Sequence, residues 1–101
     1  MLNWSTVNDF DLKTINLIKT LLKNHPKLLL FIFNQKKPQL RTSSSIILEE
    51  ALAFSSGEII LVKLALDLWD RSGNSKFMDV IDLLSNENLL QVQKAFSLNF
   101  E

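Results

Sequence analysis

The stretch from Ser55 to Gly73 constrains the fold more than any other part of this chain. Ser55 and Glu58 have the Ser-x-x-Glu spacing of a capping box, in which each side chain satisfies a free backbone N–H at a helix start. At the other end, Gly73 is a residue that readily adopts the positive φ common after a helix. Nine of the eleven residues that follow Glu58 are apolar. Because a helix that apolar must be surrounded by other helices, the segment predicts a central helix over about Ser56–Ser72.

Amphipathic spacing predicts further short helices around this central one. Their expected ranges are 9–24, 26–35, 44–54, 76–84 and 85–98. The range 28–33 is apolar throughout, so a buried strand competes with a helix there, and we favour the helix because no second strand is available for pairing. The predicted fold is all-α: a single domain over residues 1–101, built as a compact bundle of five to six short helices packed around the central apolar helix.

The helix expected over 76–84 is apolar on more than one side. We expect its apolar residues to lie largely inward, as part of the core. These residues are Phe77, Met78, Val80, Ile81, Leu83 and Leu84.

The sequence contains almost no groups for catalysis or metal binding. It has no cysteine, and its one histidine, His25, precedes a proline at a helix junction. The Asp67/Asp70 and Asp79/Asp82 pairs have the i,i+3 spacing of any solvated helix face, and no phosphate-binding loop or nucleophile motif is present. We therefore predict no catalytic residue, no metal site, no cofactor and no enzymatic activity.

No signal peptide is visible in the first ten residues, and the longest apolar run, over 28–33, is too short to span a membrane. We therefore expect a cytoplasmic protein.

Protein binding is the function that these features favour. Two apolar helices compete for one small interior. Either the core holds both, or one apolar surface is left for a partner, which would be another protein or a second copy of the chain. The charge is also uneven, at +5 over residues 1–41 and −5 over residues 42–101. The candidate partner-binding residues are Lys36, Lys37 and Arg41 on a basic connector, the polar stripe Lys63, Asp67, Asp70 and Arg71 of the central helix, and Trp69 beside that stripe.

A compact chain of this kind would suit an adaptor, an inhibitor or an antitoxin-like factor. Its composition, rich in Lys, Asn and Ile, suggests the hypothesis of a phage or mobile-element protein.

Nucleic-acid binding is the alternative. The two helices over about 76–98 have the lengths and short junction of a helix-turn-helix, and the second would present Asn88, Gln91 and Lys94 outward to base edges. The basic connector over 36–41, with Phe31 and Phe33 just before it, offers a second route through base stacking. The second helix lies in the acidic half of the chain and carries one cation. One cation gives few contacts with phosphates.

Overall fold

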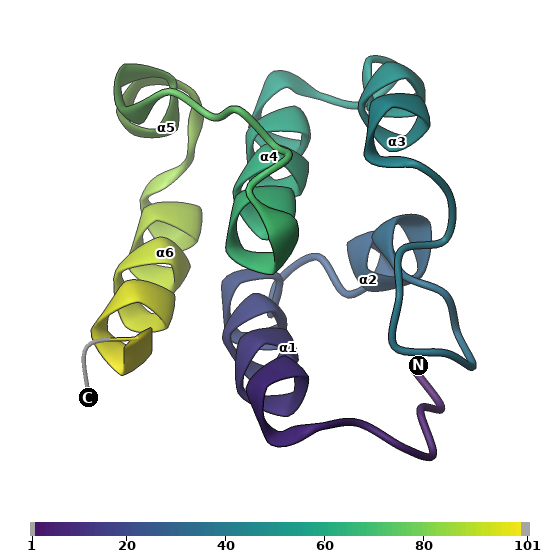
Figure 1. Ribbon diagram of the computed structural model, residues 1–101. Coiled ribbons are helices and arrows are strands. Elements are labelled where there is room, and N and C mark those ends of the chain that lie inside the picture. Colours follow the sequence, from purple (N-terminus) through teal and green to yellow (C-terminus); the bar gives the residue numbers. More distant parts are fainter. Residues whose placement is uncertain (1, 100–101) are drawn as a thin grey trace.

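The computed structural model describes the backbone of residues 2–99 and the side chains of residues 2–97. Within this range the protein is all-helical and contains no strand apart from one isolated bridge between Phe33 and Leu40 (Figure 1). The helices are α1 (Asp9–Leu21), α2 (Lys27–Ile32), α3 (Ser44–Ala51), α4 (Ser56–Asp70), α5 (Phe77–Leu83) and α6 (Asn86–Asn99). The predicted all-α fold is confirmed, and the apolar run over 28–33 is helical up to Ile32.

Helix α4 is the centre of the bundle, as its sequence predicts. It contacts α1, α2, α3 and α5, with α2 and α3 on one side of it and α5 and α6 on the other (Figure 1). Six residues of α4 are buried: Ile60, Leu61, Val62, Leu64, Ala65 and Leu66. None of the described helices has the length and apolar character needed to cross a lipid bilayer.

The start of α4 is fixed by the predicted capping box. The Glu58 backbone N–H donates to Ser55 Oγ over 3.3 Å, and Glu58 Oε1 accepts from the Ser55 N–H over 3.3 Å. The hydrogen bond from the Ser55 hydroxyl is the main reason that the pKa of Glu58 lies below its ordinary value, and Lys27, whose Nζ lies 3.4 Å from Glu58 Oε2, lowers it further. This end of the central helix is therefore tied both to its own cap and to α2.

The end of α4 differs from the sequence prediction. The helix stops at Asp70, and the residues with positive φ are Arg71 (64°) and Asn74 (55°), so the prediction that Gly73 supplies this conformation is wrong. Gly73 is needed because the chain returns against its own helix: a Cβ at this position would lie 1.7 Å from the Lys63 carbonyl oxygen. The turn therefore needs glycine for close approach rather than for backbone freedom.

Helix α2 is shorter than predicted, ending at Ile32 instead of Gln35. The chain then folds back on itself, since the Asn34 N–H donates to the Gln39 carbonyl over 2.9 Å and the Arg41 N–H donates to the Ile32 carbonyl over 2.9 Å. The extended segment before α1 packs on this turn, where Trp4 Nε1 donates to the Asn34 carbonyl over 2.7 Å.

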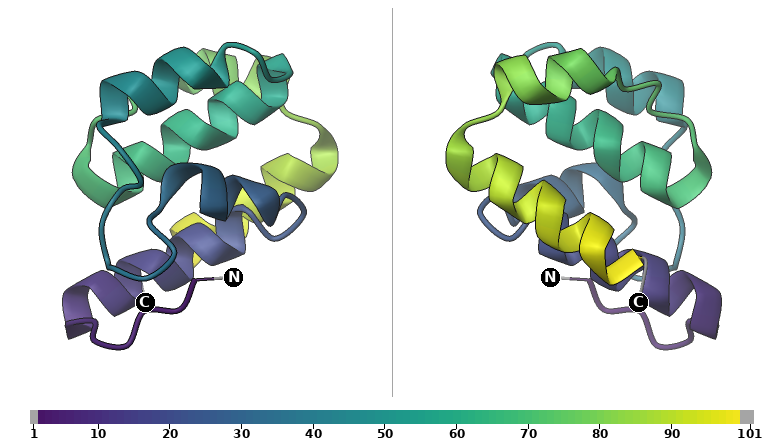
Figure 2. Two further views of the ribbon diagram at one scale, coloured as in Figure 1. Left: turned by 90° about the vertical axis from the view of Figure 1, so that its right-hand side faces the viewer. Right: turned by 90° about the vertical axis from the view of Figure 1, so that its left-hand side faces the viewer.

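Helices α1 and α6 run in opposite directions and form the most extensive helix–helix contact of the bundle (Figure 2). His25 Nε2 lies 3.1 Å from Asn88 Oδ1, which joins the residues after α1 to the first turn of α6. Ile18 of α1 and Val92 and Ala95 of α6 are buried and belong to the hydrophobic core. The two helices farthest apart in the sequence thus close the bundle.

Candidate functional site

Helix α5 turns most of its apolar residues toward solvent. Phe77 is 76% exposed and Met78 is 61% exposed, and Ile81 and Leu83 are also exposed. The prediction that these four residues lie inward is wrong, whereas Val80 and Leu84 are buried as expected. The physical reason is position: α5 lies at the edge of the bundle, so one side packs on α4 and the other side has no helix over it (Figure 1).

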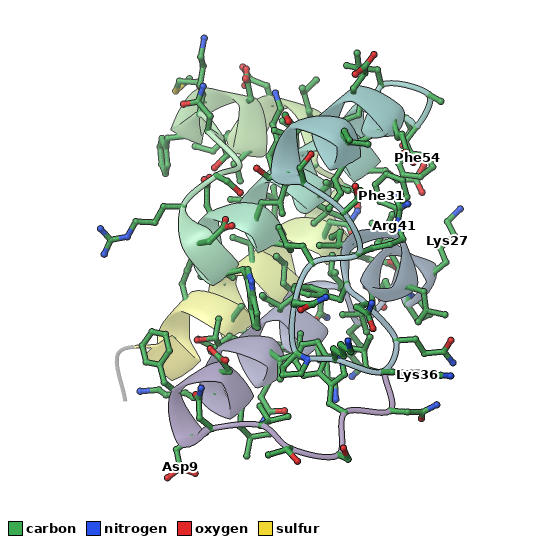
Figure 3. The ribbon with its side chains drawn as sticks, turned by 45° about the vertical axis from the view of Figure 1, so that its right-hand side comes forward. Asp9, Lys27, Phe31, Lys36, Arg41 and Phe54 are labelled. Atoms are coloured by element: carbon green, nitrogen blue, oxygen red, sulfur yellow. The ribbon has the colours of Figure 1, made fainter. Side chains whose placement is uncertain are left out.

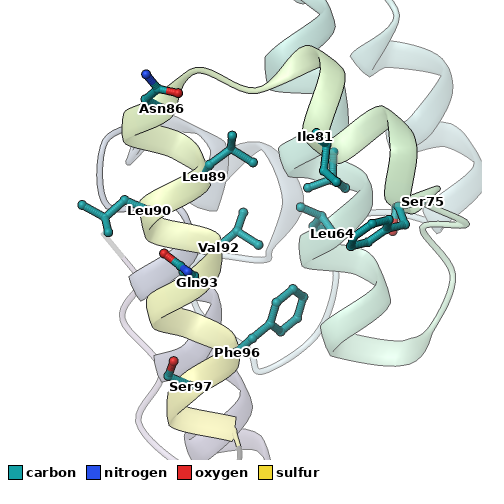
Figure 4. A pocket seen from close by; sticks show the side chains of 12 residues that line it. Leu64, Ser75, Ile81, Asn86, Leu89, Leu90, Val92, Gln93, Phe96 and Ser97 are labelled. Atoms are coloured by element: carbon teal, nitrogen blue, oxygen red, sulfur yellow. The ribbon is translucent and has the colours of Figure 1, made fainter.

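The exposed side of α5 borders a cleft of about 930 Å³ between α4, α5 and α6 (Figure 4). Leu64 of α4 lies at its base, Phe77 and Ile81 come from α5, and Leu90 and Phe96 come from α6. The remaining lining residues are Ser75, Val80, Asn86, Leu89, Val92, Gln93 and Ser97. Several apolar side chains of the cleft are therefore accessible to a binding partner.

The chemistry of the lining is that of a binding site for apolar groups. None of the described residues that line it carries a charge, and their polar side chains are neutral amides and hydroxyls. Among the described residues, no three His, Asp or Glu side chains are grouped so that they could hold a metal ion. The cleft offers apolar contacts and a few hydrogen bonds, which suit recognition.

The basic connector is partly occupied by contacts within the chain (Figure 3). The Arg41 guanidinium lies 5.3 Å from the centre of the Phe31 ring, and its Nη2 lies 3.0 Å from Glu50 Oε2. Lys36 and Lys37 are exposed, and their backbone N–H groups both donate to Asn34 Oδ1 over 2.9 Å. Arg41 thus belongs to the structure of the bundle, and the two lysines face solvent.

The polar stripe of α4 is mostly engaged with the turn that follows it. Asp67 accepts hydrogen bonds from the Asn74 N–H over 2.8 Å and from the N–H and hydroxyl of Ser75. Asp70 accepts from the N–H and hydroxyl of Ser72. Lys63 is half-buried and Arg71 is exposed, so the four residues do not form one free surface.

The hydrogen bonds to Asp67 also set its protonation. Burial acts to raise the pKa of this carboxyl, but the donors from Ser75, Asn74 and Gly73 outweigh it and hold the pKa below its ordinary value of 3.8. The charged carboxylate is therefore the form that closes the turn.

Trp69 lies in an aromatic cluster rather than on an open surface. Its ring centre is 5.1 Å from that of Phe33 and 5.8 Å from that of Trp4. Trp69 and Trp4 are both half-buried, and Phe33 is fully buried. The cluster holds the segment before α1 against α4 and the turn after α2.

The three candidate residues of the proposed reading helix lie in different environments. Gln91 is buried, with 7% of its surface exposed, so the prediction that it faces outward is wrong. Asn88 is half-buried against His25, and Lys94 is exposed. The other proposed nucleic-acid site, on the basic connector, also offers little aromatic surface for base stacking. Phe33 is buried, and the Arg41 guanidinium lies over the Phe31 ring.

Comparison of the chain with protein-family models, with curated proteins and with solved structures finds no match. The function must therefore be argued from the geometry of the chain itself.

The sequence left open whether the core holds both 28–33 and the central helix or leaves one apolar surface uncovered. Leu28, Leu29, Ile32 and Phe33 are buried together with six residues of α4, so both segments contribute to the core, and the exposed apolar surface of the cleft lies on α5 instead. The signal that could have located the cleft is the segment 77–84, in which six of eight residues are apolar and only Asp79 and Asp82 are polar. Such a helix exposes apolar groups unless it is fully enclosed.

Proposed function

We propose that this protein is a non-catalytic protein-binding protein, and that the cleft between α4, α5 and α6 receives apolar side chains from its partner. The observation that carries the proposal is the outward apolar side of α5, with Phe77 76% exposed beside a charge-free cleft. Contiguous exposed apolar surface of this kind marks interaction sites in proteins.

The cleft suits a helical segment of the partner better than an extended one. An extended segment adds to the edge of a sheet, and the described residues contain no sheet to extend. A helix satisfies its own backbone hydrogen bonds and needs only apolar contacts along one side. Since α6 has 14 residues and is about 21 Å long, the cleft has room for roughly four turns of a partner helix.

Within this class, we propose that the protein acts in the cytoplasm as an adaptor, an inhibitor or an antitoxin-like factor. A role in a phage or mobile element remains a hypothesis based on composition. In each case the partner would be held through the cleft rather than modified.

A selection of helical peptides tests the proposal. A displayed library of 14-residue amphipathic helices is selected on the full chain, and enriched peptides are titrated against variants. We expect Phe77→Ser and Leu90→Ser to weaken binding at least tenfold, because each removes an apolar contact from the cleft. Phe10→Ser is the matched control, because Phe10 is 75% exposed on α1 and does not line the cleft.

The same variants connect peptide binding to the partner in the cell. A photo-crosslinking residue at position 90 should capture a protein through an amphipathic helix, and the selected peptide should compete for that capture. A crosslinker at Leu52, which is 71% exposed on the α3 side, is the control. Peptides that bind equally to Phe77→Ser and wild type would refute the proposal, and tight, salt-sensitive DNA or RNA binding lost on changing Lys36 and Lys37 would favour the nucleic-acid alternative.

A further inference from the structure

A second hollow adjoins the cleft on the outward side of α6. It has a volume of about 440 Å³ and is lined by Thr20 of α1 and by four residues of α6. Three of these four, Leu90, Gln93 and Ser97, also line the cleft (Figure 4). A partner seated in the cleft therefore has the hollow beside it, toward α1.

The hollow offers hydrogen-bond donors and one positive charge. Lys94 is the only charged residue among the described residues that line the hollow or the cleft. It is exposed and takes part in no ion pair within the described chain. Ser97 follows Gln93 by four positions and Lys94 by three, so these side chains are neighbours on α6. An ammonium, an amide and a hydroxyl are all donors, and a carboxylate has acceptor sites for about four hydrogen bonds.

The charged residues around Thr20 are also cations. Lys19 and Lys23 are the charged residues nearest to Thr20 in the sequence, and both are exposed. Neither takes part in an ion pair within the described chain. The α1 side of the hollow therefore favours an anion, as Lys94 does.

The acidic residues of the three helices around the cleft line neither the cleft nor the hollow. Asp67 is held by its hydrogen bonds to the turn after α4. Asp79 stands two positions after Phe77, which places it on the opposite side of α5. Glu87 is seven positions, or about 10 Å, before Lys94 along α6. The full set is Glu58, Asp67, Asp70, Asp79, Asp82 and Glu87.

The cleft supplies the apolar part of an interface, and the hollow supplies polar surface beside it. The exposed large apolar residues of the cleft present roughly 400 Å², taking about 200 Å² for a fully exposed large side chain. They are Phe77, Ile81, Leu90 and Phe96. A standard interface buries about 800 Å² on each partner, of which somewhat more than half is apolar. The polar remainder must come from the rim, where the hollow contributes a cation.

We infer that the partner helix carries an Asp or Glu on one flank of its apolar side, and that this carboxylate binds at Lys94. The inference rests on the proposed function, because it names the chemistry of the helix that the cleft receives. Neighbouring residues of a helix lie about 100° apart, so the acidic residue directly precedes or follows an apolar anchor in the partner sequence. Such a charge pair on the rim fixes the register of the helix and excludes partners with a cation at that position.

Parallel selections test the inference. The displayed library of 14-residue amphipathic helices is selected on the full wild-type chain and on Lys94→Glu. We expect Asp or Glu to be enriched on one flank of the apolar side with wild type, and Lys or Arg at the same position with Lys94→Glu. Lys36→Glu is the matched control, because it makes the same change in net charge on the connector between α2 and α3, and it should return the wild-type preference.

Titration of the most enriched wild-type peptide gives the size of the effect. Lys94→Glu should weaken its binding about tenfold, because the acidic residue then meets a like charge. A peptide with Lys in place of the acidic residue should bind Lys94→Glu within about threefold of the original pair, since opposite charges meet again. Peptides without an acidic preference, or binding that Lys94→Glu leaves unchanged, overturn the inference, as does an equal loss with Lys36→Glu.

The outcomes also separate this inference from the proposed function. Peptides that depend on Phe77 and Leu90 but not on Lys94 remove the acidic residue and leave the cleft as the site of a partner helix. A chain that enriches no helical peptide removes both.

Discussion

Replacing Gly73 with alanine should destabilise the protein severely, because the new Cβ would lie 1.7 Å from the Lys63 carbonyl oxygen and 2.9 Å from the Lys63 Cα. These are backbone atoms in the middle of α4, so they cannot move aside. Relief requires the turn after α4 to withdraw by more than about 1 Å, given that such contacts are not shorter than about 3 Å in folded proteins.

The cost follows from the hydrogen bonds that the turn would lose. The N–H groups of Asn74 and Ser75 lie 2.8 and 3.0 Å from the Asp67 carboxylate, and neither bond survives such a displacement. A hydrogen bond to a charged group contributes about 1.5–3 kcal/mol, so the loss of two lowers the free energy of unfolding by about 3–6 kcal/mol. That is a large part of the total of about 5–15 kcal/mol expected for a domain of this kind.

Urea denaturation followed by circular dichroism measures this loss, and a thermal melt should show a Tm lower by about 20 °C. Gly57→Ala is the matched control: its Cβ would lie 3.3 Å from the Leu83 carbonyl oxygen, a contact that a shift of a few tenths of an ångström relieves. We expect that variant to remain within about 1 kcal/mol of wild type. A Gly73→Ala protein that is equally stable would refute the close approach and the reasoning built on it.

Three further predictions concern the interior, the turn and the amino-terminal segment. Gln91→Leu should raise the free energy of unfolding by about 1 kcal/mol in urea titrations, because Gln91 Oε1 is buried without a hydrogen-bond partner among the described residues. Gln93 is exposed, so the control variant Gln93→Leu should change the free energy of unfolding little. Because the pKa of Asp67 is lowered in the fold, the contribution of its carboxylate to stability is complete at neutral pH and is lost as the pH falls below about 4. An Asp67→Asn protein should therefore be less stable than wild type at pH 7, and it should lose less stability than wild type on acidification. Trp4→Ala should lower the free energy of unfolding by about 2 kcal/mol and shift the fluorescence emission of Trp69 to the red, since Trp69 would lose the Trp4 ring 5.8 Å away. An unchanged emission spectrum would show that the segment before α1 does not cover Trp69 in solution.

Features encoded by neighbouring residues could be predicted from the sequence. The capping box of α4 depends on Ser55 and Glu58, which lie three residues apart, so spacing alone identifies it. The central place of α4 also follows from its own composition, because a helix with so few polar residues is stable only when other helices enclose it.

Features that depend on distant packing could not be predicted. The apolar pattern of α5 does not say which of its sides meets α4, and the outward position of Phe77 and Met78 is decided by where the chain places α5 at the bundle edge. Gln91 is a similar case, since its polar character suggested solvent whereas it is buried in the bundle.

Two errors have a common origin in the turn after α4. Asp67 looked like part of a solvated stripe because its partners, Asn74 and Ser75, come back to it only after the chain has reversed. Gly73 looked like a residue chosen for positive φ, and its actual constraint is the nearby backbone of Lys63. A one-dimensional pattern indicates that a helix ends near these residues, but it does not give the path that the chain takes back along the helix.

The contact between α1 and α6 has a consequence for how the protein is made. A ribosome releases α1 well before α6, since residues 25 and 88, which are in contact in the fold, are 63 positions apart. Until α6 leaves the exit tunnel, the side of α1 that it will cover remains open to water or to other nascent chains. The bundle therefore closes only after α6 has been synthesised, and a chain broken off before α6 keeps an uncovered apolar surface that favours aggregation and degradation.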